Sequence, residues 1–468
     1  MARFMIAGTG SGCGKTTLTA AILQALVDRS CSPASYKCGP DYIDTMYHTR
    51  ITGRPARNLD SFLCPPDALR RFLLRGEAET GLAVIEGVMG FYDGIGGTSQ
   101  ASSCEISLQT ETPVLLALRP KGTALSLAAV VQGFRGFQEN RIAGLLLNGV
   151  SKGMYAFYKK ILEEQTGLPV YGYLPELPEA SFESRHLGLY TAGELADFQE
   201  KMRILSDAAK ESLDLDGILA LARTAPALDL SDQMEPWPVP DVRIGIARDA
   251  AFCFYYADGL EALCRAGAEL VPFSPLEDAG LPEGISGLYI GGGYPELYAE
   301  ALSANQAMRH AISAAAADGM PVVAECGGFL YLQNSLDHLQ RSPEMEEPAS
   351  LPLPMCGVVP GHAAMTRKLV RFGYCILEAQ RDNLLCRAGE RLHAHEFHYA
   401  DSDCCGTDFL AQRAKGGEKW SCIHAGETWW IGFPHIHFGG NPKAAYRFIH
   451  AARRYQAEKI VKRGTEEC

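Results

Sequence analysis

Residues 8–17 read Gly-Thr-Gly-Ser-Gly-Cys-Gly-Lys-Thr-Thr and directly follow the apolar run 4–7. Apolar residues Leu18, Ile22 and Leu26 then recur at the spacing of a helix. A short buried strand, a glycine-rich loop and a helix, in this order, are the setting in which a loop binds phosphate. The stretch therefore predicts an α/β domain whose first strand leads into a phosphate-binding loop.

The loop offers backbone and side-chain groups suited to a nucleotide. Small residues let successive N–H groups turn toward phosphate oxygens, and the helix N-terminus adds its positive end. The standard pattern has glycine where Thr9 stands, so this loop is a variant with Gly8 one residue further back. The alternative, a glycine-rich turn that binds nothing, is disfavoured by the strand–helix setting. The expected nucleotide-binding residues are Ser11, Gly12, Gly14, Lys15, Thr16 and Thr17.

Three acidic residues lie near the expected ends of strands. Asp41 and Asp44 follow a turn signal at Gly39, and Glu86 ends an apolar run. Ligands of open α/β sheets bind beyond the C-terminal ends of strands, and a buried carboxylate there needs a cation. We expect Glu86, with Asp41 or Asp44, to form a Mg²⁺ site with the Thr16 hydroxyl. For each acid, helix capping or turn formation is the alternative interpretation.

Further apolar runs predict the remaining strands of two doubly wound α/β domains. Residues 196–223 are charged with a helical pattern, and residues 225–241 are rich in proline and polar residues. We therefore expect a first domain over 1–195, a helical connector and linker over 196–241, and a second domain over 242–468. The predicted strands lie at residues 82–85, 113–118, 142–147, 170–174, 242–247, 269–273, 288–290 and 321–324.

The overall composition excludes several classes of protein. The 468 residues are 47% hydrophobic, and the formal net charge of −12 disfavours general binding to nucleic acid. No apolar run approaches the ~20 residues of a membrane helix, and from the first residues we expect no signal peptide. The 15 cysteines include no Cys-x-x-Cys pair, so neither a disulfide scaffold nor a zinc site is indicated. We expect a cytoplasmic protein, and the sequence leaves a homodimer open.

One cysteine lies where a nucleophile would be expected. Cys326 ends an apolar run and is followed by two glycines and an apolar helical pattern, which resembles a tight strand-to-helix turn. A helix N-terminus lowers a thiol pKa, and either His435 or His437 could supply a base. Candidate oxyanion-hole donors are the backbone N–H groups of Gly292, Gly293 and Gly327. An inert buried thiol is the alternative for Cys326.

These motifs together resemble the family of cobyrinic acid a,c-diamide synthases. That family joins a dethiobiotin-synthetase-like ATP domain to a class I, triad-type glutaminase domain. The resemblance runs in order along the whole chain. The stretches that carry it are residues 11–17, 37–44, 86–94, 185–189, 247–256, 291–296, 325–328, 395–399 and 435–438.

The resemblance implies an ATP- and glutamine-dependent ligase with Mg²⁺. It implies that Cys326 forms a thioester with glutamine and that His435 is its base. The ammonia released would capture acyl phosphates of the a- and c-acetate carboxylates of cobyrinic acid, with Asp41, Asp44 and Glu86 around that step. Triad glutaminases usually carry glutamate two residues after this histidine, where this chain has His437. What orients the His435 ring is therefore left open.

Two further readings stay open at the level of sequence. Sister enzymes of the same architecture act on other tetrapyrrole side chains or rings, namely cobyric acid synthase and the diamide synthases of Ni-sirohydrochlorin or hydrogenobyrinic acid. A partitioning-type P-loop switch ATPase, whose second domain only binds a partner, is the alternative of another class. The turn at Cys326 argues against that alternative, because a binding module has no use for an activated thiol.

Overall fold

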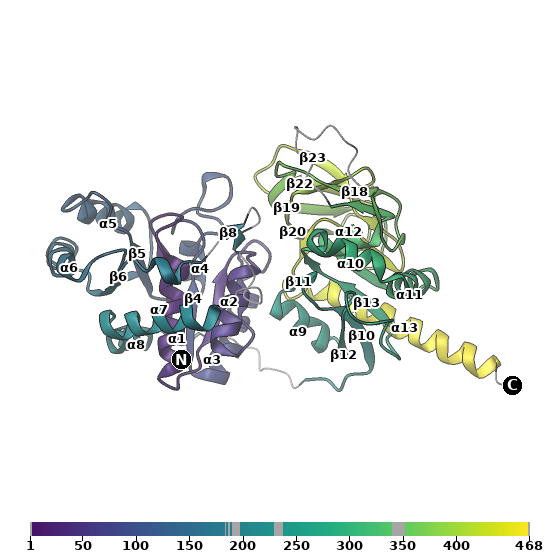
Figure 1. Ribbon diagram of the computed structural model, residues 1–468, viewed down its shortest axis with the longest axis horizontal. Helices are drawn as coiled ribbons and strands as arrows, with labels where there is room; N and C mark the ends of the chain where they lie inside the picture. The colour runs from purple at the N-terminus through teal and green to yellow at the C-terminus, as the bar shows by residue number, and fades with distance from the viewer. Residues whose placement is uncertain are drawn as a thin grey trace. The chain divides into compact units, whose positions relative to one another are not determined.

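The computed structural model of the chain describes residues 2–182, 184–185, 188–189, 197–228, 237–338 and 352–466. The chain divides into two compact units, Met1–Gln233 and Met234–Cys468, and each is described here by itself (Figure 1). The expected connector lies partly outside the described residues. Its described part forms helices α7 (Phe198–Ser212) and α8 (Leu215–Ala222), both of which belong to the first unit.

The first unit is built on a seven-stranded parallel sheet in the order β3-β2-β4-β1-β5-β6-β7. Central strands such as β4 and β5 are buried along their whole length, which explains their uninterrupted apolar sequences. The strands are β1 (Ala2–Gly8), β2 (Ala34–Cys38), β3 (Arg57–Leu59), β4 (Leu82–Glu86), β5 (Val114–Leu118), β6 (Ile142–Asn148) and β7 (Val170–Leu174).

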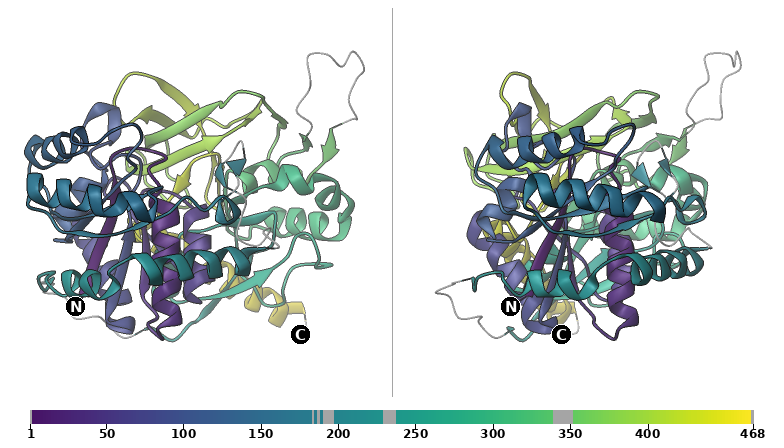
Figure 2. Two further views of the ribbon diagram at one scale, coloured as in Figure 1. Left: turned by 60° about the vertical axis from the view of Figure 1, so that its left-hand side comes forward. Right: turned by 90° about the vertical axis from the view of Figure 1, so that its left-hand side faces the viewer.

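Helices alternate with these strands and cover the sheet (Figure 2). Helix α1, which follows the phosphate loop, contacts both α2 and α7, while α5 contacts α6. The sheet's central strand β1 therefore ends at a loop fixed by α1, at the edge where ligands of doubly wound folds bind. The helices are α1 (Lys15–Asp28), α2 (Ile43–Thr52), α3 (Pro66–Thr80), α4 (Ser103–Gln109), α5 (Ser126–Phe137) and α6 (Lys152–Thr166).

The second unit contains a six-stranded sheet in the order β12-β10-β13-β15-β25-β24. All its pairings are parallel except that of β24 with β25. The strands are β10 (Val242–Ala247), β12 (Ala268–Phe273), β13 (Gly287–Ile290), β15 (Val322–Glu325), β24 (His424–Ala425) and β25 (Trp429–Gly432). The helices are α9 (Ala257–Arg265), α10 (Ala299–Ala304), α11 (Gln306–Ala317), α12 (Gly327–Leu332) and α13 (Pro442–Glu466). The predicted α/β class is confirmed in both units.

Three further sheets, antiparallel except for the parallel pairing of β16 with β18, complete the second unit. The largest has the order β23-β22-β19-β20-β26, and smaller ones have the orders β17-β16-β18-β21 and β11-β14. The sequence did not predict them, because their strands alternate buried and exposed residues instead of forming continuous apolar runs. The strands are β11 (Phe252–Phe254), β14 (Gly292–Gly293), β16 (Ser335–Asp337), β17 (Leu353–Pro354), β18 (His362–Met365), β19 (Arg371–Ala379), β20 (Arg391–His398), β21 (Ala400–Ser402), β22 (Phe409–Arg413), β23 (Lys419–Cys422) and β26 (His435–Ile436).

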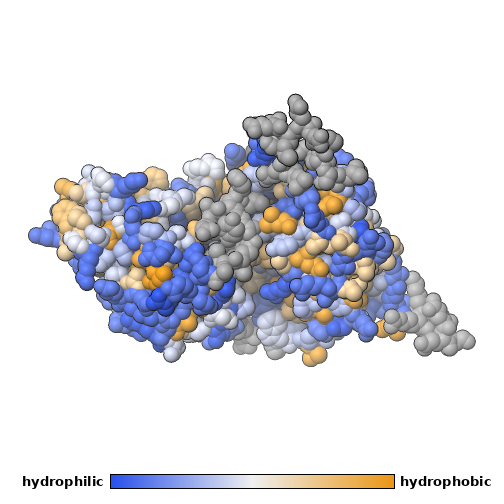
Figure 3. Space-filling model, viewed as in Figure 1, coloured by the Kyte–Doolittle hydropathy of each residue, from blue (hydrophilic) through white to orange (hydrophobic). Residues whose placement is uncertain are grey.

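The surface in Figure 3 is mainly hydrophilic with interspersed apolar residues. Exposed apolar side chains include Phe137 on α5 and Phe157 on α6. Among the described residues, no helix combines the length and the apolar character needed to cross a membrane. Arg185 of the short strand β8 (Ser184–Arg185) and both residues of β9 (Gly188–Leu189) belong to the resemblance-bearing stretch 185–189, the rest of which lies outside the described residues.

Candidate active sites

The phosphate loop connects β1 to α1 in the first unit. Gly14 precedes α1 with φ +97°, a left-handed conformation that glycine adopts without strain. A side chain at this position would also collide with Asn148, whose Nδ2 donates to the carbonyl of Cys13 at 3.2 Å. Lys15 Nζ donates to the carbonyl of Gly10 at 3.0 Å, which folds the lysine back over the loop. The loop therefore has a shape that only glycine permits at its last turn.

A cavity of about 480 Å³ opens at this loop. Its walls combine the loop and the start of α1 with three segments at the ends of β5, β6 and β7. These segments lie at the C-terminal ends of strands, the position at which doubly wound folds bind nucleotides. The cavity is lined by Gly12, Gly14, Lys15, Thr16, Thr17, Arg119, Asn148, Gly149, Pro175, Glu176, Leu177, Pro178, Ala180, Ser181 and Phe182.

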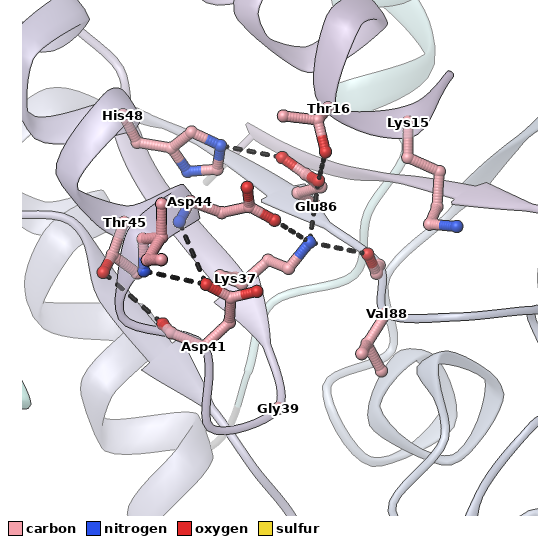
Figure 4. Close-up of polar contacts among 12 residues, drawn as sticks. Lys15, Thr16, Lys37, Gly39, Asp41, Asp44, Thr45, His48, Glu86 and Val88 are labelled. Carbon is pink, nitrogen blue, oxygen red and sulfur yellow. Dashed lines mark hydrogen bonds and ion pairs between the residues drawn. The ribbon is translucent and has the colours of Figure 1, made fainter. Parts of the chain in front are cut away.

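A buried polar cluster lies beside the loop (Figure 4). Glu86 Oε1 accepts hydrogen bonds from Thr16 Oγ1 and from Lys37 Nζ, each at 2.7 Å. Glu86 Oε2 lies 2.9 Å from His48 Nε2, and Lys37 Nζ lies 2.5 Å from Asp44 Oδ2. The parallel register of β2 and β4 explains the central pair, because Lys37 and Glu86 are direct partners across the two strands.

The contacts decide which members of this cluster are charged. Burial alone would raise the pKa of Glu86, but Lys37 and His48 hold it below its usual range. Burial and the neighbouring Asp41 raise the pKa of Asp44 well above its usual range. Burial would lower the pKa of Lys37, but the charges of Asp44 and Glu86 raise it well above its usual range. The cluster therefore favours a charged Lys37–Glu86 pair, with Asp44 as the carboxyl that takes up a proton most readily.

Asp41 has a different environment from the other two acids. Its Oδ1 accepts from the backbone N–H groups of Ile43 at 2.8 Å and Asp44 at 3.0 Å, at the start of α2. One of its oxygens therefore performs the helix-capping role named above as the alternative. No group of three or more His, Cys, Asp or Glu side chains is arranged to hold a metal in the part of the chain that the structure describes. Thr16 and Glu86 are in contact, and the Mg²⁺ site expected at these residues stays a prediction.

In the second unit, Cys326 connects β15 to α12. Its backbone has φ +49° and ψ −102°, a conformation that a non-glycine residue adopts only under constraint. The constraint comes from both sides, because Cys326 N donates to the carbonyl of Gly432 at 2.8 Å and Gly328 N donates to that of Gly291 at 3.0 Å. A strained turn between a buried strand and a helix is the geometry of a nucleophile elbow.

The candidate oxyanion residues lie around this turn. Gly327 is the first residue of α12, where a backbone N–H has no partner within the helix. A Cβ on Gly327 would lie 3.0 Å from the nitrogen of Gly293, so the two residues are neighbours. A Cβ on Gly292 would lie 2.6 Å from Cε1 of His435. The structure thus gathers Gly292, Gly293, Gly327 and His435 at the turn that carries Cys326.

The two late histidines have distinct surroundings. The His435 side chain is hydrogen-bonded to Cys326, and its Nδ1 lies 3.5 Å from Oε2 of Glu325. His437 is stacked on Tyr256 at 4.7 Å between ring centroids, and its Nδ1 accepts from the N–H of Gly440 at 3.2 Å. Burial lowers the pKa of His437 to about 3, so that this ring stays neutral. Of these two histidines, His435 is the one in contact with Cys326.

Sequence reasoning missed four residues of these sites. Lys37 lies in the stretch 37–44 and His48 four residues beyond it, but neither received a role, because their partner Glu86 is far away in sequence. Glu325 was overlooked because the third member of the triad was expected only two residues after His435. Tyr289 was overlooked because its role follows from its contact with Glu325. A buried glutamate directly before a candidate nucleophile was the available signal.

Two family models match the chain, one in each unit. Residues 4–188 match the CobQ/CobB/MinD/ParA nucleotide binding domain, and residues 243–442 match the CobB/CobQ-like glutamine amidotransferase domain. A nucleotide-binding unit joined to a glutamine amidotransferase unit defines an ATP-using, glutamine-dependent amidating ligase.

Relatives of known name match the chain over nearly its full length. The cobyrinate a,c-diamide synthase of Listeria innocua is 39% identical over 463 residues, which cover 97% of this chain and 100% of that protein. That of Dehalococcoides mccartyi is 38% identical, with 97% and 99% coverage, and that of Salmonella typhimurium is 37% identical, with 96% and 98% coverage. The chain belongs to the cobyrinate a,c-diamide synthase family.

Proposed function

We propose that the chain converts the a- and c-acetate carboxylates of cobyrinic acid to amides, using ATP and ammonia taken from glutamine. The observation that carries this proposal is the full-length likeness to relatives named for that reaction, 39% identical over 97% of this chain. The arrangement of the two sites supports the chemistry. One unit contains a phosphate loop with a buried acidic cluster, and the other contains a strained cysteine beside a histidine.

In the glutaminase unit, Cys326 attacks the side-chain amide of glutamine and forms a thioester. His435 takes the thiol proton and returns it to the leaving nitrogen, so that ammonia departs. Water then cleaves the thioester to release glutamate. The N–H groups of Gly293 and Gly327 are our candidates for stabilising the negative oxygen of the tetrahedral intermediates, because both lie at the turn.

In the nucleotide unit, each carboxylate first becomes an acyl phosphate, since carboxylate oxygen is a poor leaving group. Lys15 and the loop N–H groups bind the phosphates, and Asp44 is the candidate to accept a proton as ammonia attacks the acyl phosphate. Thr16 and Glu86 fit Mg²⁺, because both provide hard oxygen ligands beside the phosphate loop. When bound there, Mg²⁺ neutralises negative charge on the phosphates.

The experiment is mass spectrometry of cobyrinic acid incubated with the protein, Mg-ATP and amide-labelled glutamine. The expected product carries two labelled amides and does not form without ATP. If ATP and glutamine are hydrolysed but cobyrinic acid is unchanged, the proposed substrate is wrong. Hydrogenobyrinic acid, Ni-sirohydrochlorin and the substrate of cobyric acid synthase would then be tested in the same assay.

A further inference from the structure

A buried glutamate directly precedes the candidate nucleophile. Glu325 is the last residue of β15, and its side chain is only 1% exposed. Its Oε2 lies 3.5 Å from Nδ1 of His435, whose side chain is 3% exposed. A carboxylate that has lost its water needs partners that compensate its charge. The imidazole of His435 is the one ionisable cation within ion-pair distance of Glu325 among the described residues.

Two further contacts fix the orientation of this carboxylate. The hydroxyl of Tyr289, on the neighbouring strand β13, donates to Oε2 at 3.1 Å. The backbone N–H of Ile436 donates to Oε1 at 3.0 Å. Because Ile436 directly follows His435, one oxygen of Glu325 is attached to the segment that carries the base while the other faces its ring. These contacts fix the position of the Glu325 carboxylate relative to the His435 ring.

We propose that Glu325 is the positioning residue of the glutaminase site and takes the role of the acid that triad glutaminases carry two residues after the histidine. Glu325 would accept a hydrogen bond from Nδ1–H of His435, which fixes the tautomer and leaves Nε2 for the thiol of Cys326. His437 cannot take this role, because it is stacked on Tyr256 and accepts from Gly440. The inference rests on the glutaminase activity of the proposed function.

The groups that face His435 come from several elements. Cys326 and Glu325 lie at the end of β15, His395 is the partner of His435 on β20, and Tyr289 stands behind Glu325. Burial disfavours the imidazolium, but the contacts with Cys326 and Glu325 raise the pKa of His435 to about 10. Burial and the charge of His435 lower the pKa of His395 to about 3, so His395 is neutral. Glu325 is therefore the anion that balances the imidazolium when the thiol is protonated.

The test compares wild-type protein with Glu325→Gln, which keeps the shape and removes the charge. We expect kcat for glutamine hydrolysis to fall by about 100-fold or more, as in other triads that lose the orienting acid. The alkaline limb of the kcat/KM profile should also move to lower pH, because the imidazolium loses its counter-charge. Amidation driven by ammonium chloride at a single pH should be unchanged, since it bypasses the glutaminase site.

A second readout requires neither glutamine nor tetrapyrrole. Iodoacetamide alkylation of Cys326, followed on its peptide by mass spectrometry, reports the thiolate that the imidazolium stabilises. We expect slower alkylation at neutral pH in Glu325→Gln. Alkylation can be measured even if the proposed substrate is wrong. A failure of the Glu325 proposal can therefore be distinguished from a failure of the proposed function.

Two further variants serve as controls. Glu325→Asp keeps the charge and should recover most of the pH profile, whereas Glu261→Gln removes a carboxylate on α9 that is 10% exposed and should change neither readout. The proposal would be overturned if Glu325→Gln had the same kcat, pH profile and alkylation rate as the wild-type protein. An equal loss at every pH that Glu325→Asp does not recover would also overturn it, because that result indicates a purely structural role.

Discussion

At the scale of single residues, the backbone of Cys326 separates it from the other cysteines. The 14 described cysteines form no disulfide, and many are buried, so burial alone does not mark a nucleophile. Among them only Cys326 has a positive φ, at +49°. Strain of this kind persists where the surrounding structure fixes it, and here it lies at the turn between β15 and α12. The sequence predicted the turn from the glycines, and a Cβ on Gly328 would lie 2.1 Å from the carbonyl oxygen of Ile290, which explains why a glycine is needed there.

We predict that Cys326→Ser abolishes glutamine-dependent amidation while amidation from ammonium chloride continues. The hydroxyl is a far weaker nucleophile than the thiolate, so the glutamine-dependent rate should fall by about 1,000-fold or more. Glutamate release and amide formation are measured side by side with each nitrogen donor. Cys264→Ser, a half-buried cysteine on α9, is the matched control. Glutamate release that survives in Cys326→Ser would show that another residue is the nucleophile.

Gly292→Ala is predicted to displace the catalytic base. Its Cβ would lie 2.6 Å from Cε1 of His435, closer than carbon atoms approach without a shift of one of them. A displaced base should lower kcat for glutamine hydrolysis by about 10- to 100-fold with little effect on ammonia-dependent amidation. Gly280→Ala, where a Cβ meets nothing within 4 Å, is the control. Equal activities of the two variants would contradict the placement of His435.

At the scale of elements, the sequence revealed the strands buried on both faces but not the half-buried ones. Continuous apolar runs identified β4, β5 and β15, whose residues are all buried. Strand β19 alternates buried and partly exposed residues over its second half, and its short apolar stretch, residues 374–377, was not recognised as a strand. The same limit applies to the sites. Glu86 could be predicted from the end of its own strand, whereas Lys37 became visible only through the register of β2 with β4.

The pairing of β2 with β4 leads to a prediction about stability. Lys37→Met leaves Glu86 and Asp44 buried without their shared cation, a loss that costs about 3–5 kcal/mol for buried pairs. The free energy of unfolding at pH 7, measured with urea, should fall by this order. Lys152→Met removes a lysine that is 83% exposed and pairs with Glu211 on the surface, so it should change the value by less than about 1 kcal/mol. Similar effects of both substitutions would show that the buried cluster adds no stability.

The attachment of α13 should depend on pH. Arg447 on this helix donates to Glu390 Oε1 at 3.0 Å, and this hydrogen bond lowers the pKa of Glu390 to about 2. A carboxyl whose folded pKa is depressed stabilises the protein above its unfolded pKa of 4.5, and this stabilisation is lost as pH falls toward 2. Because Glu390 is 38% exposed, solvent limits the effect of Glu390→Gln to less than about 1 kcal/mol at pH 7. Urea unfolding of the wild-type protein and of Glu390→Gln should show a smaller difference in the free energy of unfolding at pH 3.5 than at pH 7. An equal difference at both pH values would contradict the assigned pKa.

At the scale of the whole molecule, each unit has its own sheet and its own buried core, and each contains one of the two chemistries. Composition and length predicted a chain of more than one domain. They could not locate the helices α7 and α8 in the first unit, because this assignment depends on packing and not on local pattern. Two separate cores imply that a substitution in one site leaves the other site folded.

This independence can be tested with two inactive chains. Lys15→Ala should lose ATP-dependent amidation from either nitrogen donor but retain glutamine hydrolysis, because Lys15 lies only in the first unit's cavity. Cys326→Ser should have the opposite defect. Since ammonia diffuses freely, a mixture of the two chains supplied with glutamine and ATP should form amide at the rate that the accumulated free ammonia supports. Each chain alone is the control. If no free ammonia accumulates and the mixture stays inactive, although Cys326→Ser alone accepts added ammonium chloride, the predicted release of ammonia to solvent is wrong.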